Sequence, residues 1–376
     1  MDKQLNIIAL NIPWPANYGG VIDIFYKIKA LHQLGVKIIL HAFEYERPPA
    51  PELEAYCEQV FYYKRKTGLL QNFSILPYNV ISRKNPLLLE RLLENDYPIL
   101  FEGLHSCYYL SDSNLKDRIK IVRSANIEHD YYLHLYKAER NFVKRIFFLI
   151  ESKRFARYEK QIRQADLVLA ISESDKTSLK SRYPKNNIAL LSAFHENKRV
   201  SAKEGTSDFI LYHAKLSVVE NEKAALFLIN KVFSQLKYTC VIAGMNPSPA
   251  LLNAAMPYPN IRIEANPSAE RMNFLIEEAH IHALVTFQDT GLKLKLLNSL
   301  FAGRHVLVNS LMLTGSGLES LCHQADSPEE MICQCNKLMQ IPFNASQIAE
   351  RENVLFPTYN NMFQAKRLYD MIYGAN

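Results

Sequence analysis

The stretch 286–303 (TFQDTGLKLKLLNSLFAG) contains residue types that can hold an anion. Its pattern predicts the end of a strand, a loop with Thr290 and Gly291, and then a helix. Backbone N–H groups at the start of a helix lack partners within it, so they favour a phosphate or a carboxylate. Lys293 and Lys295 add positive charge, although their spacing places them on different faces of the helix. The segment therefore predicts either a phosphate-binding turn or an ordinary strand-to-helix turn with surface lysines.

Other predicted strand ends carry further candidates. Lys215 follows the predicted strand 209–213, and a lysine that faces a helix start there suits a diphosphate. The alternative is an exposed lysine without a ligand. Gly19 and Gly20 follow the first predicted strand, where paired glycines let the backbone approach a ligand closely. The chain has only 12 glycines among its 376 residues, so a pair at this turn is informative.

Two acid–base candidates, Glu102 and His105, follow the predicted strand 98–102. In open α/β sheets, ligands bind beyond the carboxyl ends of the strands, and both residues are expected at that edge. Either side chain could contact a hydroxyl group of a bound ligand, where a general base would act.

These candidates belong to an alternating β–α pattern that runs through the chain. In the first half, the predicted strands are 5–10, 36–43, 59–63, 98–102, 118–123, 167–171 and 187–191, and the predicted helices are 21–34, 85–95 and one or two within 128–164. In the second half, the strands 209–213, 239–243, 261–264, 283–287 and 306–309 alternate with the helices 221–236, 269–280, 292–302 and 327–340, and a last helix spans 359–373. This alternation indicates two doubly wound α/β sheets.

The polar segment 197–208 has no apolar periodicity and marks the expected boundary between two domains. We expect an N-terminal Rossmann-like domain over 1–200 and a C-terminal one over 205–356. The tail, 357–376, is expected to cross back to the first domain. Two such sheets that face each other would form a deep cleft between them.

Composition narrows the class of protein. Hydrophobic residues make up 48% and charged residues 22%, as in ordinary folded domains. The six cysteines form no C-x-x-C pair, so we expect reduced thiols in a cytoplasmic protein and no metal site. No signal peptide is visible and no stretch approaches 18 apolar residues, so a membrane-spanning helix is not expected. No nucleic-acid-binding module is present either.

The segment 137–163 is strongly basic. It contains nine Lys and Arg against three Glu, a surplus equal to the net charge of +6 of the whole chain. Its apolar run IFFLI is flanked by basic pairs, as in helices that lie on an anionic membrane. The alternative is a long helix with a solvated basic face and a buried apolar face.

Several of these segments resemble the large retaining GT-B glycosyltransferase family known as family 4. The family's donor-site pattern G-x-x-x-K-x-x-E-A-x-x-x-G-x-x-V-V is matched at Gly291, Lys295, Gly303 and Val306. The family glutamate that holds the nucleotide ribose falls on Asn298 here. The earlier acidic partner falls on Gln288 or Thr290, depending on the register. An amide can still accept a ribose hydrogen bond, but a charged acceptor contributes more.

The resemblance extends to other segments, in the family's order. Lys215 stands at the Arg or Asn of the family's G-R-L or G-N-L, and Gly244 resembles the close-packed glycine near the nucleotide. The loop with Gly19 and Gly20 would reach the cleft. The stretch 123–132 resembles R-x-H-N-I-E-x-x-Y-Y, with Glu128 matching and the family histidine replaced by alanine.

The resemblance implies a cytoplasmic bacterial enzyme of cell-envelope polysaccharide synthesis. It would move a sugar from a nucleotide sugar to a glycan or lipid-linked acceptor, with retention and without a metal or other cofactor. Glu102, His105 and Glu128 would serve on the acceptor side, and a peripheral membrane contact through 137–163 would fit. The alternative is a degenerate GT-B protein that binds a sugar nucleotide or a partner without catalysis. A sugar-nucleotide epimerase on the same fold would need a set of carboxylates and a histidine that the sequence does not place.

Overall fold

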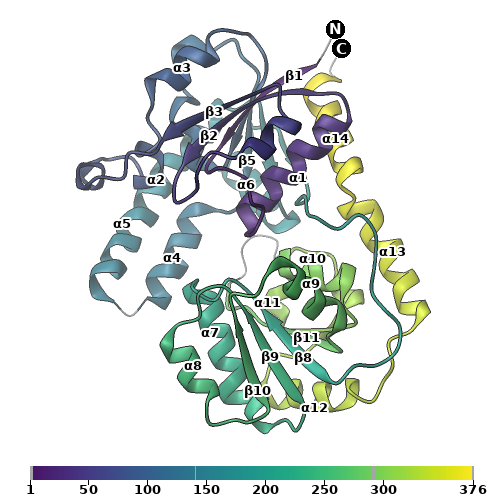
Figure 1. The fold of residues 1–376 in the computed structure, drawn as a ribbon. Coiled ribbons are helices and arrows are strands. Elements are labelled where there is room, and N and C mark those ends of the chain that lie inside the picture. Colours follow the sequence, from purple (N-terminus) through teal and green to yellow (C-terminus); the bar gives the residue numbers. More distant parts are fainter. Residues whose placement is uncertain (1–2, 140, 289–293, 375–376) are drawn as a thin grey trace. The chain divides into compact units, whose positions relative to one another are not determined.

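The computed structural model describes residues 3–139, 141–288 and 294–374 (Figure 1). The chain divides into two compact units. Unit 1 contains the described residues up to Glu196 together with those from Thr358 onward, and unit 2 contains those from Asn197 to Pro357. Each unit is built around its own parallel sheet.

The sheet of unit 1 has the strand order β3-β2-β1-β4-β5-β6-β7, with parallel pairing throughout the described strands. The order reverses between β1 and β4, and such a switch point is where open α/β sheets bind ligands. The strands are β1 Gln4–Ala9, β2 Lys37–Glu44, β3 Gln59–Lys64, β4 Ile99–Glu102, β5 Lys120–Ser124, β6 Leu167–Ala170 and β7 Ile188–Leu190.

Helices cover both faces of this sheet, and the apolar runs of its strands explain why. In β1, Leu5 and Ile7 pack on the same side as α1, whereas Ile8 packs on the opposite side with Phe155 of α5. Strands that are buried on both faces have such continuous apolar sequences. The helices of unit 1 are α1 Gly19–Gln33, α2 Tyr78–Ile81, α3 Pro86–Leu92, α4 Glu128–Ala138, α5 Phe142–Tyr158, α6 Glu173–Arg182 and α14 Asn361–Tyr373.

The last helix, α14, packs in unit 1. Its residues Ala365, Leu368 and Ile372 join the core cluster that contains β1 and α1. The Tyr373 hydroxyl donates to the Gln4 carbonyl oxygen at 2.7 Å. Helix α14 is thus held at β1, and Figure 1 shows this yellow helix beside the purple helix α1.

The sheet of unit 2 has the order β10-β9-β8-β11-β12-β13 and again reverses at its first strand in the sequence, β8. Its strands are β8 Phe209–His213, β9 Thr239–Gly244, β10 Ile261–Ala265, β11 Ile281–Leu284, β12 His305–Val308 and β13 His323–Gln324. Its helices include α7 Val219–Phe227, α8 Pro249–Ala255, α9 Ala269–Glu278, α10 Leu294–Ala302, α11 Ser310–Leu313 and α12 Pro328–Leu338, and α13 spans Ala345–Tyr359.

The predicted strands are confirmed within a few residues, but several elements differ. The helix predicted over 221–236 is α7 followed by a π turn at Leu228–Val232 and a short 3₁₀ helix. The prediction of one or two helices within 128–164 is confirmed as α4 and α5, which are separate because Asn141 caps α5 by accepting from the Lys144 N–H at 3.1 Å. The sequence pattern did not predict α2, α8, α11, α13 or the short strand β13. Among the described residues, no helix combines the length and apolar character needed to cross a membrane.

Candidate functional site

Candidate residues lie at the carboxyl ends of the strands in each unit. In unit 2, Lys215 is exposed in the turn between β8 and α7. Asn221, at the start of α7, donates from its Nδ2 to the Lys215 carbonyl oxygen at 3.0 Å. Its Oδ1 accepts from Lys295 Nζ of α10 at 3.3 Å, and the same Nζ lies 3.5 Å from the Tyr212 hydroxyl. Asn221 thus joins the backbone at Lys215 to the side chain of Lys295 at one edge of the sheet.

A third lysine, Lys223, belongs to the same edge. Its Nζ lies 4.4 Å from the centre of the Phe287 ring, within the range of a cation–π interaction. The chain therefore presents lysines from the β8–α7 turn, from α7 and from α10. A cluster of ammonium groups at strand ends can bind an anion such as a diphosphate.

The segment after β11 is held by two side chains that the sequence analysis did not single out. Glu220 Oε1 accepts from the Thr286 hydroxyl at 3.0 Å and from the Phe287 N–H at 2.6 Å. Asn309, after β12, accepts from the Thr286 N–H at 3.1 Å and donates to the Thr286 carbonyl oxygen at 2.7 Å. These bonds replace strand pairing, so β11 ends at Leu284 and not at 287 as predicted.

Predicted donor-side residues lie on both sides of the next, undescribed segment. Gln288 is half-buried, and its N–H donates to the Thr286 hydroxyl at 3.2 Å. Thr290, Gly291 and Lys293 lie outside the described residues, so their predicted roles stay predictions. Asn298, on α10, is half-buried, and its Oδ1 accepts from Asn197 Nδ2 at 3.0 Å.

A buried hydrogen-bond chain lies beside these residues. His282 Nε2 donates to the Ile276 carbonyl oxygen at 3.0 Å, so its Nδ1 accepts from the Ser299 hydroxyl at 2.9 Å. Ser299 Oγ then accepts from His213 Nε2 at 3.1 Å. Burial, followed by the charge of Lys295, lowers the pKa of His213 to about 3, so the chain is neutral. It fixes the ring of His213 at the carboxyl end of β8.

Two glycines that matched the family pattern are required by packing. A Cβ at Gly244 would lie 1.8 Å from the Ala214 carbonyl oxygen, so only glycine lets the ends of β9 and β8 approach this closely. A Cβ at Gly303 would lie 2.0 Å from His282 Nε2 and would displace that ring. Both glycines therefore shape the strand ends, whether or not a ligand is bound.

In unit 1, the structure brings His105 and Glu128 together. His105 follows β4, Glu128 begins α4, and His105 Nε2 lies 3.6 Å from Glu128 Oε2. Burial raises the pKa of Glu128 to about 8, with Glu159 adding to the effect and Arg83 opposing it. Burial lowers the pKa of His105 to about 3, with Arg83 adding to the effect. At neutral pH the contact is thus between a mostly protonated carboxyl and a neutral imidazole.

Arg83 is the positive group that the sequence analysis missed here. It is buried, and its guanidinium donates to the Leu10 carbonyl oxygen at 3.0 and 2.7 Å. It is thereby fixed between the end of β1 and the pair. Among the described residues, the buried His105 Nδ1 has no hydrogen-bond partner. Gly19 and Gly20 begin α1 on the same side of unit 1, after its N-cap, Tyr18.

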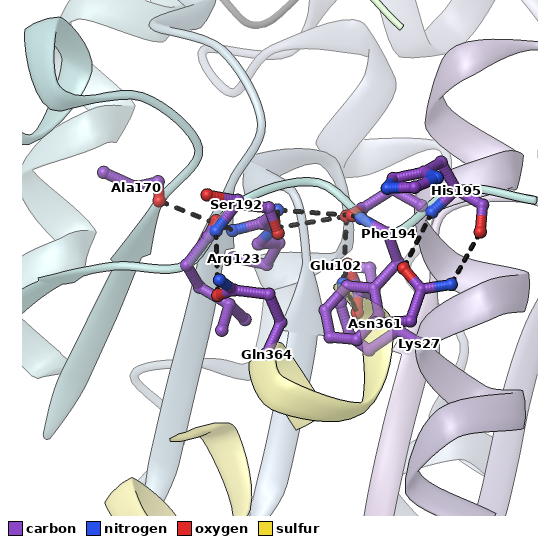
Figure 2. Close-up of polar contacts among 11 residues, drawn as sticks. Lys27, Glu102, Arg123, Ala170, Ser192, Phe194, His195, Asn361 and Gln364 are labelled. Carbon is purple, nitrogen blue, oxygen red and sulfur yellow. Dashed lines mark hydrogen bonds and ion pairs between the residues drawn. The ribbon is translucent and has the colours of Figure 1, made fainter. Parts of the chain in front are cut away.

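Glu102 lies in a different environment (Figure 2). Its two carboxylate oxygens accept from Lys27 Nζ at 2.7 and 3.0 Å, and the residue is 2% exposed. Lys27 also contacts Asp23, whose carboxylate accepts from Arg123 at 3.2 Å and from the Phe194 N–H at 2.8 Å. Burial raises the pKa of Asp23, but Arg123 and Lys27 outweigh it and hold that pKa well below its usual value.

This ion network fixes α1 against β4, β5 and the chain after β7. Arg123 also donates to the carbonyl oxygens of Leu191 and Ser192, and the Ser192 N–H donates to Gln364 of α14. The described geometry favours His105 and Glu128 over Glu102 as groups that could meet a substrate. The catalytic role of Glu102 stays a prediction, and the network gives that residue a clear structural role.

Comparisons with known proteins place this geometry in a wider context. No protein family model matches the chain. A Klebsiella pneumoniae protein, described as an uncharacterized 44.6 kDa protein in the cps region, is 24% identical over 394 residues and aligns with 99% of this chain and 100% of its own.

Solved structures match over nearly the whole chain. Anabaena HepE in complex with UDP and glucose has a TM-score of 0.67 at 9% identity, covering 99% of this chain and 100% of its own. A variant of S. aureus TarM in complex with fondaparinux, α-GlcNAc-glycerol and UDP has a TM-score of 0.68 at 10% identity, with the same coverage. A Rickettsia africae glycosyltransferase has a TM-score of 0.65 at 14% identity and covers 100% of both chains. The chain has the GT-B fold of these glycosyltransferases.

Proposed function

We propose that this protein is a glycosyltransferase that moves a sugar from a nucleotide sugar to a glycan or lipid-linked acceptor. The observation that carries the proposal is that Asn221 holds the backbone at Lys215 and the ammonium group of Lys295 at the same strand ends of unit 2. It occurs on a fold whose structural neighbours include complexes with UDP and UDP-glucose.

In the proposed reaction, charge develops on the leaving nucleoside diphosphate. Preorganised cations at that position stabilise the transition state more than the ground state. Lys215 and Lys295 supply this charge, and the contribution expected from Thr290 and Gly291 stays a prediction from the sequence. No metal is required when side chains and a helix N-terminus take this role. By the family resemblance, the anomeric configuration is retained.

The other donor-side residues hold the nucleotide. Asn298 takes the place of the ribose-binding glutamate, and an amide oxygen can accept from a ribose hydroxyl. Gln288 follows the end of β11 at Leu284, and we assign it a contact with the nucleotide from the family resemblance. Gly244 lets the β9 end approach the turn that carries Lys215.

The acceptor side is assigned to His105 and Glu128, with Gly19 and Gly20 shaping the start of α1. A histidine whose pKa is about 3 accepts a proton poorly, and a carboxyl whose pKa is about 8 is a hydrogen-bond donor at neutral pH. The pair therefore suits hydrogen bonds to sugar hydroxyls better than proton removal.

A thermal-shift panel tests the donor site. The purified protein is mixed with UDP-, GDP-, ADP- and dTDP-sugars and with the free nucleotides. At roughly 100 times the dissociation constant, a ligand adds about 2.7 kcal/mol of stability. We expect one base to raise the melting temperature clearly, with UDP as the first candidate. If every nucleotide leaves the melting temperature unchanged, the donor-site proposal is wrong.

A second candidate function is nucleotide-sugar binding without catalysis, and Asn298 is the observation that favours it. The substitution Asn298→Glu keeps an oxygen acceptor for Asn197 Nδ2 and restores the family's charge. A large gain in donor affinity or turnover would indicate an eroded site. A loss of donor affinity would indicate that Asn298 is adapted to its ligand. Turnover is measured as nucleotide release from the donor that the panel identifies.

The cellular setting is also part of the proposal. The curated relative is described as lying in a cps region, which supports a role in a bacterial cell-envelope polysaccharide. The enzyme would then act in the cytoplasm, where nucleotide sugars are available, with 137–163 as its peripheral contact to the inner face of the membrane.

A further inference from the structure

The turn after β3 exposes a cluster of large apolar side chains. Leu69, Leu70, Phe73 and Ile75 lie in or beside the 3₁₀ helix Leu69–Phe73, and each is between 81% and 84% exposed. Single apolar residues are common on protein surfaces, but a contiguous group with such exposure marks an interaction site. The sequence analysis did not identify this turn, because its apolar residues resemble those of a buried segment.

The turn lies against α5, which carries its own exposed apolar residues. Arg154 of α5 donates to the Asn72 carbonyl oxygen at 2.6 Å, and Glu151 accepts from the Tyr78 N–H at 2.8 Å. Towards the start of α5, Phe142 and Val143 are 74% and 75% exposed. Both elements belong to unit 1, where α5 lies beside α2 and the turn (Figure 1).

Basic side chains accompany both apolar groups. The stretch 59–89 contains five Lys and Arg and no Asp or Glu. Within it, Lys64 and Lys66 are exposed beside the turn. On α5, Lys144 and Arg145 are exposed next to Phe142 and Val143. The carboxylate of α5, Glu151, is buried and paired with Arg154 at 2.8 Å, so it offsets little of the surface charge.

We propose that residues 69–75 and the exposed face of α5 together form a surface that docks on an anionic lipid bilayer. The apolar side chains insert among the acyl chains, while the lysines and Arg145 contact the lipid phosphates. The combination of apolar tips with a basic surround distinguishes a bilayer from an apolar protein partner, which would need no such charge. The surface extends beyond the basic segment 137–163, because its most exposed apolar residues come from a separate turn. The inference rests on the membrane contact proposed for 137–163 and extends it. Because docking does not require sugar transfer, a loss of vesicle binding and a loss of nucleotide binding are separate outcomes.

Co-sedimentation with lipid vesicles tests the docking. The full chain is mixed with vesicles of phosphatidylcholine alone or of an equimolar mixture with phosphatidylglycerol. We expect binding to the anionic vesicles, weakened by salt, and little binding to the neutral ones. The variant Leu69→Ser/Leu70→Ser/Phe73→Ser should bind anionic vesicles more weakly by a factor on the order of ten or more.

Matched controls come from unit 2, which also has exposed apolar and basic side chains. The variant Phe274→Ser/Met256→Ser/Phe356→Ser removes three exposed apolar groups there and should bind like the unaltered protein. The charge variant Lys144→Glu/Arg145→Glu should lose binding, whereas the change of two exposed lysines of unit 2, Lys231→Glu/Lys237→Glu, should not. All variants alter exposed side chains, and an unchanged melting temperature verifies their folding.

Insertion is measured with a tryptophan in the turn. The fluorescence of Phe73→Trp should shift to shorter wavelength with anionic vesicles, and that of Phe356→Trp should not. The proposal is overturned if the unaltered protein ignores anionic vesicles, or if the turn variant binds them as well as the control does. It is also overturned if the turn variant changes only the self-association of the protein, because a second copy would then cover this surface.

Discussion

The strand ends of the two units differ in their charged groups. In unit 2, lysines from the β8–α7 turn, from α7 and from α10 surround one edge, and Lys215 and Lys223 are exposed. In unit 1, the candidate pair His105 and Glu128 is nearly buried and mostly neutral at physiological pH. The first edge is suited to an anion, and the second to uncharged hydroxyl groups. This is the division that a transfer from a nucleotide sugar to an acceptor would require.

The Glu102 network shows why a polar strand end is not by itself a binding site. Glu102 and Arg123 end adjacent strands, as site residues often do, yet they hold opposite charges against α1. Two carboxylates and two cations compensate one another within unit 1. Such groups stabilise the fold only as a complete set, since removal of one member leaves a buried charge without its partner.

The largest expected effect follows from this network. Asp23→Ala leaves Arg123 and Lys27 with a single carboxylate, and we expect a loss of about 3–5 kcal/mol in the stability of unit 1. Trp14, the single tryptophan of the chain, packs 5.0 Å from the Phe25 ring of α1, so its fluorescence during urea unfolding reports on unit 1. The exposed Asp117→Ala is the control and should change stability by less than about 0.5 kcal/mol. Equal stabilities of the two variants would contradict the role of the network.

A smaller effect is expected at the lysines of unit 2. Lys295→Ala removes a charge-assisted contact worth about 1.5–3 kcal/mol, so nucleotide affinity should fall by a factor on the order of ten to one hundred. Calorimetric titration with the nucleotide from the panel measures the change. Lys337→Ala, at an exposed lysine of α12, should bind like the unaltered protein. Glu128→Gln should also leave nucleotide affinity unchanged. If this variant lost as much nucleotide affinity as Lys295→Ala, the nucleotide could not be assigned to the strand ends of unit 2 alone.

A third expected effect concerns the pH dependence of unit 1. Because the pKa of Glu128 is raised to about 8, the unfolded chain releases this proton first, and stability falls as the pH rises from about 4 to about 8. Glu128→Gln removes the titration but keeps a neutral side chain. Relative to the unaltered protein, the variant should gain at least about 1 kcal/mol between pH 5 and pH 8. Urea unfolding followed at Trp14 measures this, with the exposed Glu90→Gln as control. If the stability of the unaltered protein and that of Glu128→Gln change with pH in the same way, the pKa of Glu128 is not raised, which would contradict the prediction.

The sequence predicted the sheets well because each strand is a short apolar run that ends at polar residues. The resemblance to the family singled out Gly244 and Gly303. The structure gives a physical reason for glycine at both positions, because a Cβ atom at either would collide with a neighbouring residue. The contact between Lys27 and Glu102 could not be predicted from the local sequence pattern, because these residues are 75 positions apart. Glu220 was missed for the same reason, as its partners on the β11 loop follow 66 and 67 residues later.

Hydrogen exchange with and without the nucleotide tests the central assignment most directly, because it shows which edge holds the anion. We predict that the bound nucleotide slows amide exchange in the segments 212–221, 286–288 and 294–298 of unit 2, while the segment 102–132 of unit 1 exchanges as before. Protection confined to 102–132, with no change in unit 2, would contradict the assignment of the nucleotide to the lysine edge.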